Sequence, residues 1–408
     1  MGFTTKVLTT KYPKKDSYGA LRFPTYENAA FEFDTAEDIE AAFKGIKPAH
    51  AYSRSTNPSV EYFEKTILSV TNALGCLGFS SGMGATSNCI LALVKTGDEI
   101  ICSNKLFGTT YSLFKDTFPN LGIDVKFVDF SNIQVIESSI TDKTRALFFE
   151  TITNPQMEIF NIPEIVKLAN KYKIPTIADI TATPPYIFDS KKFNIDISVL
   201  SSTKFISGGG TNIGGLIIDN GLFDWKNNIN LHEDAKKYGN FTFIRKLRLE
   251  IFRNNGACMS AHSATNFSLG LETMEIRIDR ACKNAQSVAE FLETHSKVTN
   301  VRYAGLKNSK HYSLAKEFFT YPGSIICFEL ESKKACFTFI NSLSIIRRAT
   351  NLHDNKSLII HPSSTIYSEY NLEEQATIGV TDKMIRLSVG IENIEDLLED
   401  LQQAFDKM

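Results

Sequence analysis

The chain has 408 residues, 43% of them apolar, and a formal net charge of -2. This length predicts about two to three domains, and the apolar content excludes a disordered chain. The balanced charge argues against nucleic-acid binding, and no apolar stretch reaches the roughly 18 residues needed to span a membrane.

Cysteine and histidine spacing argues against disulfide and metal frameworks. The seven cysteines form no CxxC pair, and most lie in apolar stretches, as core thiols do. The seven histidines show neither HxxxH nor HExxH spacing, so no metal site is predicted. The first residues, MGFTTKVLTTKYPKK, lack the apolar core of a signal peptide, and we expect a cytoplasmic protein.

The N-terminal region, about residues 1–55, shows no helical or strand periodicity. It contains Pro13, Pro24 and many aromatic residues, which predicts an extended arm. Near its end, the stretch AYSRSTNPSVEYFEK places Tyr52 and Arg54 two residues apart. Arginine is suited to bidentate phosphate contact, but the pair is equally consistent with a surface ion-pair donor beside a packed ring.

The stretch FSSGMGATSN, residues 79–88, leads small residues into an amphipathic helix. A helix N-terminus with free backbone N–H groups can bind phosphate. The same stretch is equally typical of a well-capped helix. The pattern alone does not decide between a phosphate site and a capped helix.

The middle of the chain alternates short apolar runs with longer amphipathic ones. The helical pattern of residues 162–173 lies between two such runs. This alternation predicts a mostly parallel sheet with helices on both faces. The expected buried strands are residues 99–103, 124–129, 145–150, 174–179, 196–201 and 214–219.

Polar residues follow three of these strands. Asn154 lies in TITNP after one strand, Asp179 ends the next, and SSTK with Lys204 follows the third. Ligands of open α/β sheets bind beyond the carboxyl ends of the strands, so these groups should converge. A lysine at such a position is most often a solvated surface group. Here the glycines that follow permit close backbone approach, and an amine in a partly desolvated pocket can form a Schiff base with an aldehyde.

The pattern changes after Cys258. A long amphipathic helix over residues 271–295 precedes expected strands at 323–331 and 384–390 and a closing helix from residue 393. We therefore predict three regions: an N-terminal arm, 1–55; a large domain, 56–257; and a smaller C-terminal α/β domain, 258–408.

Taken together, the motifs resemble one enzyme family. "YSR.TNP", "SSGMGA", "NP", "AD.T.TPPY", "SSTKFISGGG" and "RLSVGIE" occur in the order found in the Cys/Met-metabolism family of pyridoxal 5'-phosphate (PLP) enzymes, the cystathionine γ-synthase-like group. The resemblance covers nearly the whole chain from about Gly19. "SSTKFISGGGT", "RRATNLHDNKSLIIHP" and "MIRLSVGIENIEDL" are most similar to O-acetylhomoserine sulfhydrylases. The resemblance implies the α/β fold of type I PLP-dependent transferases.

The resemblance implies a role for each residue around the cofactor ring. Lys204 matches the lysine that holds PLP covalently. Asp179 matches the carboxylate that pairs with the ring nitrogen, so that the ring can accept electrons. Asn154 matches an amide beside the phenolic oxygen, Thr181 joins the cofactor contacts, and Phe107 takes the position of the residue stacked on the ring.

The resemblance also implies contacts to the cofactor phosphate. Gly82 and Met83 match its backbone donors, and Ser201 and Thr203 match its hydroxyl donors.

Further phosphate contacts imply an assembly. Tyr52 and Arg54 match residues that reach the phosphate of a neighbouring subunit, and Tyr52 is also a candidate catalytic residue with Lys204 and Asp179. This implies a homotetramer built as a dimer of dimers.

The activity that the resemblance implies is γ-replacement. Arg386 matches the arginine that grips the substrate α-carboxylate, and Asn351 meets the same carboxylate in relatives. Lys204 removes the Cα proton, acetate leaves, and sulfide or a thiol takes its place, giving homocysteine or methionine. Cystathionine γ-synthase and methionine γ-lyase are the alternatives within the family, and a non-catalytic module that binds a phosphate ligand on the same fold is the alternative outside it.

Two positions depart from relatives. Phe107 replaces a tyrosine and can stack but cannot relay a proton, so Tyr52 or Lys204 itself is expected to take that role. Thr109 stands where methionine γ-lyases carry a cysteine, which favours the sulfhydrylase. The motifs leave open the acyl group on homoserine and the sulfur donor, and a sulfur-carrier protein with a C-terminal thiocarboxylate is one candidate donor.

Overall fold

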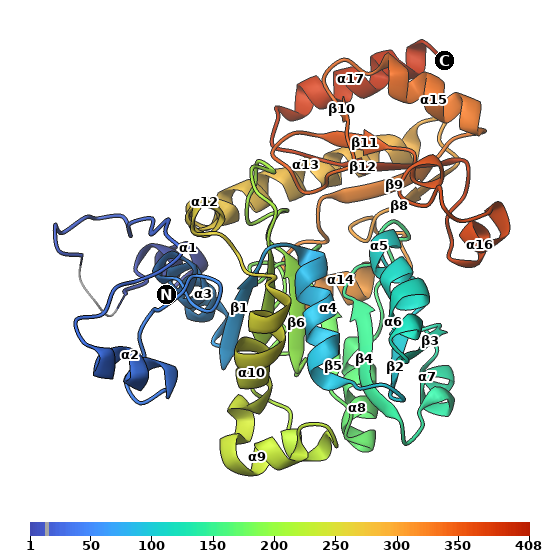
Figure 1. The fold of residues 1–408 in the computed structure, drawn as a ribbon. Coiled ribbons are helices and arrows are strands. Elements are labelled where there is room, and N and C mark those ends of the chain that lie inside the picture. The colour runs from blue at the N-terminus through green and yellow to red at the C-terminus, as the bar shows by residue number, and fades with distance from the viewer. Residues whose placement is uncertain (13–15) are drawn as a thin grey trace.

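A computed structural model describes residues 1–12 and 16–408. Pro13 of the expected arm lies outside the described residues. The described chain is built around two β-sheets, one of seven strands and one of five. Figure 1 shows the smaller sheet above the larger one, with the N-terminal segment to one side. Within the described ranges, no helix has the length and hydropathy needed to cross a bilayer.

The seven-stranded sheet has the order β1-β7-β6-β5-β4-β2-β3. Pairing is parallel from β3 through β6, and β7 runs antiparallel to both its neighbours. This confirms a mostly parallel sheet, with the six expected strands present to within two residues. Of these seven strands, the sequence did not predict β1. The strands are β1 Gly75–Phe79, β2 Glu99–Ser103, β3 Asp124–Val128, β4 Thr144–Glu150, β5 Thr176–Asp179, β6 Ile197–Ser201 and β7 Gly215–Asp219.

Helices cover both faces of this sheet. Successive residues of β4 point to opposite faces: Leu147 and Phe149 pack in the cluster that includes α8, whereas Ala146 and Phe148 pack in the cluster that includes α4. In Figure 1, α4 crosses the front of the sheet. The helices around the sheet are α3 Pro58–Thr71, α4 Gly82–Leu93, α5 Gly108–Ser112, α6 Phe118–Asn120, α7 Ile133–Ser139, α8 Ile162–Tyr172, α9 His232–Tyr238, α10 Thr242–Lys246, α11 Arg253–Asn255 and α12 Ala261–Glu272.

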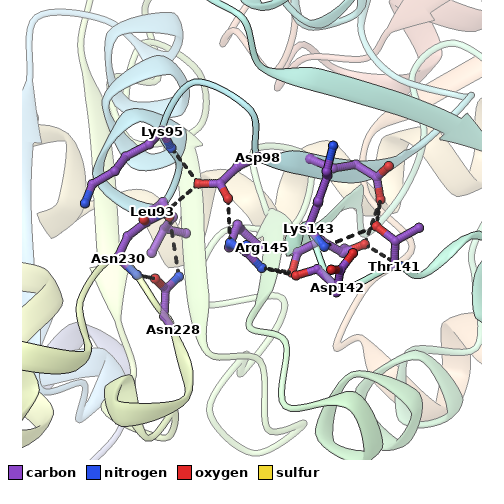
Figure 2. Close-up of polar contacts among 11 residues, drawn as sticks. Leu93, Lys95, Asp98, Thr141, Asp142, Lys143, Arg145, Asn228 and Asn230 are labelled. Carbon is purple, nitrogen blue, oxygen red and sulfur yellow. Dashed lines mark hydrogen bonds and ion pairs between the residues drawn. The ribbon is translucent and has the colours of Figure 1, made fainter.

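A polar cluster fixes the amino ends of β2 and β4. Asp98 accepts from the backbone N–H of Lys95 at 2.7 Å and from Nδ2 of Asn230 at 2.6 Å, and it lies 2.7 Å from Nε of Arg145. Figure 2 shows Asp98 between these groups, with Arg145 continuing to the carbonyl of Asp142. Because these contacts pair a nearly buried carboxylate, they stabilise the sheet edge opposite the carboxyl ends of its parallel strands.

The smaller sheet has the order β10-β11-β12-β9-β8 and is mostly antiparallel. Its apolar face packs with the long helix α13 and with α15 and α17. The expected helix over residues 271–295 is divided in the structure, because α12 ends at Glu272 and α13 begins at Met274. The elements are α13 Met274–Thr294, β8 Asn300–Arg302, α14 Tyr312–Phe318, β9 Ile325–Glu329, α15 Lys333–Ser342, β10 Arg347–Arg348, β11 Leu358–Ile360, α16 Leu372–Thr377, β12 Met384–Ser388 and α17 Ile394–Asp406.

The N-terminal segment is not extended throughout. It contains two short helices, α1 Phe3–Leu8 and α2 Ala36–Phe43. Thr35 caps α2 through its side chain and acidic residues occupy the first turn, which explains why a helix forms there. No residue of α2 is buried. Figure 1 shows this part of the chain projecting away from the large sheet.

Candidate active site

The carboxyl ends of β4, β5 and β6 open into a cavity of about 620 Å³. The start of α4, the start of α5, two segments that flank β11, Ile213 before β7 and Ile325 at the start of β9 also line it. Its lining contains ten of the candidate residues: Gly82, Met83, Phe107, Asn154, Asp179, Thr181, Ser201, Thr203, Lys204 and Asn351.

Lys204 lies three residues after the end of β6 and lines the cavity. Its Nζ donates to Oδ1 of Asn351 at 2.7 Å. Burial lowers the pKa of Lys204 to about 8, with a further lowering from the charge of Arg386 and an opposing effect of Asp354. A larger fraction of this amine is therefore neutral near pH 7 than for an exposed lysine. A neutral amine is the form that can act as a nucleophile or a base.

Asp179 and Glu150 end adjacent strands and are direct partners in the register of β4 and β5. Asp179 Oδ1 accepts the backbone N–H of Thr181 at 2.8 Å. Burial raises the pKa of Asp179, which the contacts with Thr181 oppose. Burial and then the neighbouring Asp179 raise the pKa of Glu150 well above its usual range. A cationic N–H placed against Asp179 would favour its ionised form.

The N-terminus of α4 faces the same cavity. Ser81 caps the helix by accepting the N–H of Gly84 at 2.9 Å, while the N–H groups of Gly82 and Met83 belong to the first turn, which has no intrahelical acceptors. A Cβ on Gly82 would stand 2.9 Å from that of Ser201, so only glycine permits this close approach of helix and strand. The capped-helix and phosphate-site interpretations are therefore compatible at this position.

Arg386 on β12 is buried behind the cavity lining and does not itself line the cavity. Its Nη1 donates to Oδ1 of Asn154 at 3.2 Å and its Nη2 to the carbonyl of Thr350 at 3.0 Å. Burial lowers the pKa of Arg386 to about 10, which still leaves the guanidinium charged at neutral pH. Its Nε has no partner among the described residues. A buried cation with an unused donor is suited to bind a carboxylate.

Tyr52 and Arg54 do not line the cavity of their own chain. Tyr52 is 47% exposed, and the Arg54 guanidinium lies 5.5 Å from the Tyr52 ring centroid and donates to the carbonyl of Arg253 at 2.7 Å. Thr109 is exposed and also lies outside the lining.

Sequence reasoning missed three residues of the site. Glu150 ends a predicted strand, so the rule that selected Asp179 could have selected it too. His353 lines the cavity with a φ of 53°, and its ring stacks on Phe205 at a centroid distance of 4.0 Å. Burial and the nearby charges of Lys204 and Arg386 lower the pKa of His353 well below its usual range. Tyr367 lies behind the wall, and no sequence signal marked it or His353.

Comparison with known proteins identifies the class. Residues 4–406 match the family described as Cys/Met metabolism PLP-dependent enzymes. The chain belongs to this family. It is 34% identical to an L-methionine gamma-lyase of Pseudomonas putida and 35% identical to an O-acetyl-L-homoserine sulfhydrylase of Corynebacterium glutamicum. Each alignment covers 99% of this chain and 97% of the relative.

Solved structures agree with the family and the fold. A putative O-acetylhomoserine (thiol)-lyase of Campylobacter jejuni superposes with a TM-score of 0.93 at 30% identity, over all of both chains, and carries a pyridoxyl-lysine phosphate. An O-acetylhomoserine sulfhydrylase of Wolinella succinogenes, described as catalysing a novel mechanism of sulfur transfer in methionine biosynthesis, superposes with a TM-score of 0.78 at 44% identity. That comparison covers 86% of this chain and 98% of the other. The protein is thus a PLP-dependent enzyme of fold type I.

The residues present fit this cofactor. The helix N-terminus at Gly82 suits a phosphate, the carboxylate of Asp179 suits a protonated ring nitrogen, and the amine of Lys204 suits an aldehyde. All three open into one cavity, which the Phe107 ring also lines.

Proposed function

We propose that the protein is an O-acetylhomoserine sulfhydrylase, in which sulfide or a thiol displaces acetate from the γ-carbon of O-acetylhomoserine to give homocysteine or methionine. Support comes from the sulfhydrylase of C. glutamicum and from the W. succinogenes enzyme at 44% identity. Methionine γ-lyase is the second candidate, because relatives with that activity match the chain over the same length. Cystathionine γ-synthase, with cysteine as the nucleophile, is the third.

The observation that carries the proposal is that Lys204 and Asp179 line one cavity, with Arg386 hydrogen-bonded to Asn154 of the same lining. Arg386 binds the α-carboxylate of the amino acid, with Asn351 beside it. The amino acid is then held with its Cα near the Lys204 amine. That amine is the base that takes the Cα proton and returns it at the end of the reaction.

The other candidate residues hold and tune the cofactor in this proposal. Bound PLP supplies a sink for the electron pair that remains when the Cα proton leaves. Asp179 keeps the ring nitrogen protonated, and Phe107 stacks on the ring without relaying protons. Thr181 positions Asp179 through its backbone N–H. Asn154 would hold the phenolic oxygen of the cofactor.

Phosphate binding completes the cofactor site. In the proposal, the N–H groups of Gly82 and Met83 and the hydroxyls of Ser201 and Thr203 surround the phosphate. Tyr52 and Arg54 complete the phosphate site of a neighbouring subunit, in a homotetramer made of two catalytic dimers in the cytoplasm. Tyr52 of the neighbouring subunit then supplies the phenol hydroxyl that Phe107 lacks.

A product assay tests the proposal. The purified protein is offered O-acetylhomoserine or O-succinylhomoserine with sulfide, methanethiol or cysteine, and methionine alone in a parallel reaction. We expect homocysteine from O-acetylhomoserine and sulfide as the fastest product. Rapid release of methanethiol and 2-oxobutyrate from methionine, without any replacement reaction, would show a lyase instead. If the enzyme accepted sulfur only from the thiocarboxylate of a carrier protein, the reaction would still be γ-replacement and only the sulfur donor would differ.

A further inference from the structure

The chain between β11 and β12 reaches from the small sheet to the wall of the active-site cavity. Thr365 and Ile366 line the cavity, and Tyr367 follows them with its side chain completely buried. The Tyr367 hydroxyl donates to the carbonyl of Leu106 at 3.0 Å and to the carbonyl of Asn154 at 3.0 Å. Both acceptors belong to the large sheet's loops, so one phenol joins two loops that are distant in sequence.

These two loops carry the residues that the proposed function places against the cofactor. Leu106 precedes Phe107, whose N–H donates to Oε1 of Glu150 at 2.6 Å. The N–H of Asn154 donates to Oε2 of the same carboxyl at 3.1 Å. Glu150 thus holds both loops through their N–H groups, while Tyr367 holds them through their carbonyls. Both loops are therefore held twice, by Glu150 at the end of β4 and by Tyr367 in the segment between β11 and β12.

The phenol itself is held firmly. A Cβ on Gly108 would stand 2.5 Å from the carbonyl of Ile366, so the segment packs directly on the start of α5. Nε2 of Gln375 donates to the carbonyl of Tyr367 at 2.9 Å. Nε2 of Gln156 donates to the carbonyl of Ile378 at 2.8 Å, which ties the end of the segment to the loop that carries Asn154.

We propose that Tyr367 is a positioning residue that sets Phe107 and Asn154 in their places against the cofactor. The inference rests on the proposed cofactor site and names a residue outside its contacts. Tyr367 does not supply the proton relay that Phe107 lacks, because its single hydrogen is shared between two carbonyls. Burial also raises the pKa of Tyr367 well above its usual range, so the hydroxyl stays a donor.

The test compares Tyr367→Phe with a matched control, Tyr370→Phe. Tyr370 lies three residues on in the same small apolar cluster, and its hydroxyl has no partner among the described residues. Each variant loses one phenolic oxygen and keeps its ring. The readouts are the PLP dissociation constant, from equilibrium dialysis of the holoenzyme against a series of PLP concentrations, and the visible absorbance of the bound cofactor.

We expect Tyr367→Phe to bind PLP about tenfold more weakly, because the hydroxyl hydrogen that the two buried carbonyls share is lost, and to shift the visible band. Tyr370→Phe should match the wild type in both. If Tyr367→Phe lowers the melting temperature but leaves affinity and absorbance equal to the control, Tyr367 only stabilises its segment and the inference is wrong. Neither readout involves the amino-acid substrate, so a failed sulfhydrylase assay leaves this test intact.

Discussion

Asp179 is a carboxylate whose charge depends on what lies next to it. Burial disfavours its ionised form, and only the N–H and hydroxyl of Thr181 oppose this in the structure. A protonated ring nitrogen would supply the missing positive charge. The role of Asp179 is therefore tested by removing its charge while keeping its shape.

We expect Asp179→Asn to lower turnover by orders of magnitude, because a neutral amide cannot keep the ring nitrogen protonated and the electron sink is lost. The measurement is kcat for homocysteine formation at saturating PLP. Asp219→Asn is the matched control, since Asp219 is also buried but ends β7, which runs antiparallel to β5 and β6 and ends at the opposite edge. Wild-type turnover in Asp179→Asn would show that the proposed pairing does not occur.

At the scale of single residues, the sequence predicted the groups that follow parallel strands. Asp179 ends its strand, and Asn154 and Lys204 follow theirs, at the sheet edge where the topology alone brings them together. It could not predict His353 or Tyr367, because their positions depend on how the small sheet packs over the cavity. Their neighbours in space are distant in sequence, and no local pattern records such contacts.

Among the structural elements, β7 carries a buried carboxyl at its end. Asp219 Oδ1 accepts the N–H of Gly221 at 2.9 Å, and Oδ2 has no partner among the described residues. Burial raises the pKa of Asp219 to about 7, which the Gly221 N–H opposes and Asp196 reinforces. Ionisation therefore costs more in the folded chain than in the unfolded one.

This difference predicts a pH dependence of stability. The neutral carboxyl contributes stability that is fully present below pH about 4 and is lost as the pH rises through about 7. Asp219→Asn removes the ionisation and keeps an oxygen for Gly221. We expect the variant to be more stable than the wild type by on the order of 2 kcal/mol at pH 8 and nearly equal at pH 4. Thermal unfolding at both pH values measures this, and parallel pH profiles of the two proteins would contradict it.

Strand prediction succeeded where the strands are continuous apolar runs, as expected for a parallel sheet covered on both faces. It failed for β1, because the sequence Gly75–Phe79 contains two glycines, which are depleted in strands. Pairing with β7 along its whole length forms this strand in the fold. Likewise, the break between α12 and α13 interrupts a sequence pattern that reads as one amphipathic helix.

On the scale of the whole molecule, the N-terminal segment exposes aromatic and apolar side chains to an unusual degree. Tyr18 is 97% exposed and Leu21 is at full exposure, while Tyr52 and Arg54 lie outside the cavity of their own chain. A second subunit would cover such a surface and receive these two side chains. We therefore predict that the active form contains at least two subunits.

Subunit complementation tests the shared site. Arg54→Ala and Lys204→Ala should each be nearly inactive alone. After mixing and exchange, heterodimers should recover activity, because one site then contains Lys204 of one chain and Arg54 of the other. Mass measurement of the mixed dimers confirms exchange. Exchange without recovered activity would mean that Arg54 serves its own chain.

The central claim is that the cavity around Lys204 holds PLP, and borohydride reduction tests it most directly. Reduction of the purified yellow protein fixes the cofactor to the amine that carries it, and peptide mapping then locates the label. We expect one labelled peptide, containing SSTKFISGGG and modified at Lys204. A label on any other lysine, or a protein that binds no PLP, would contradict it.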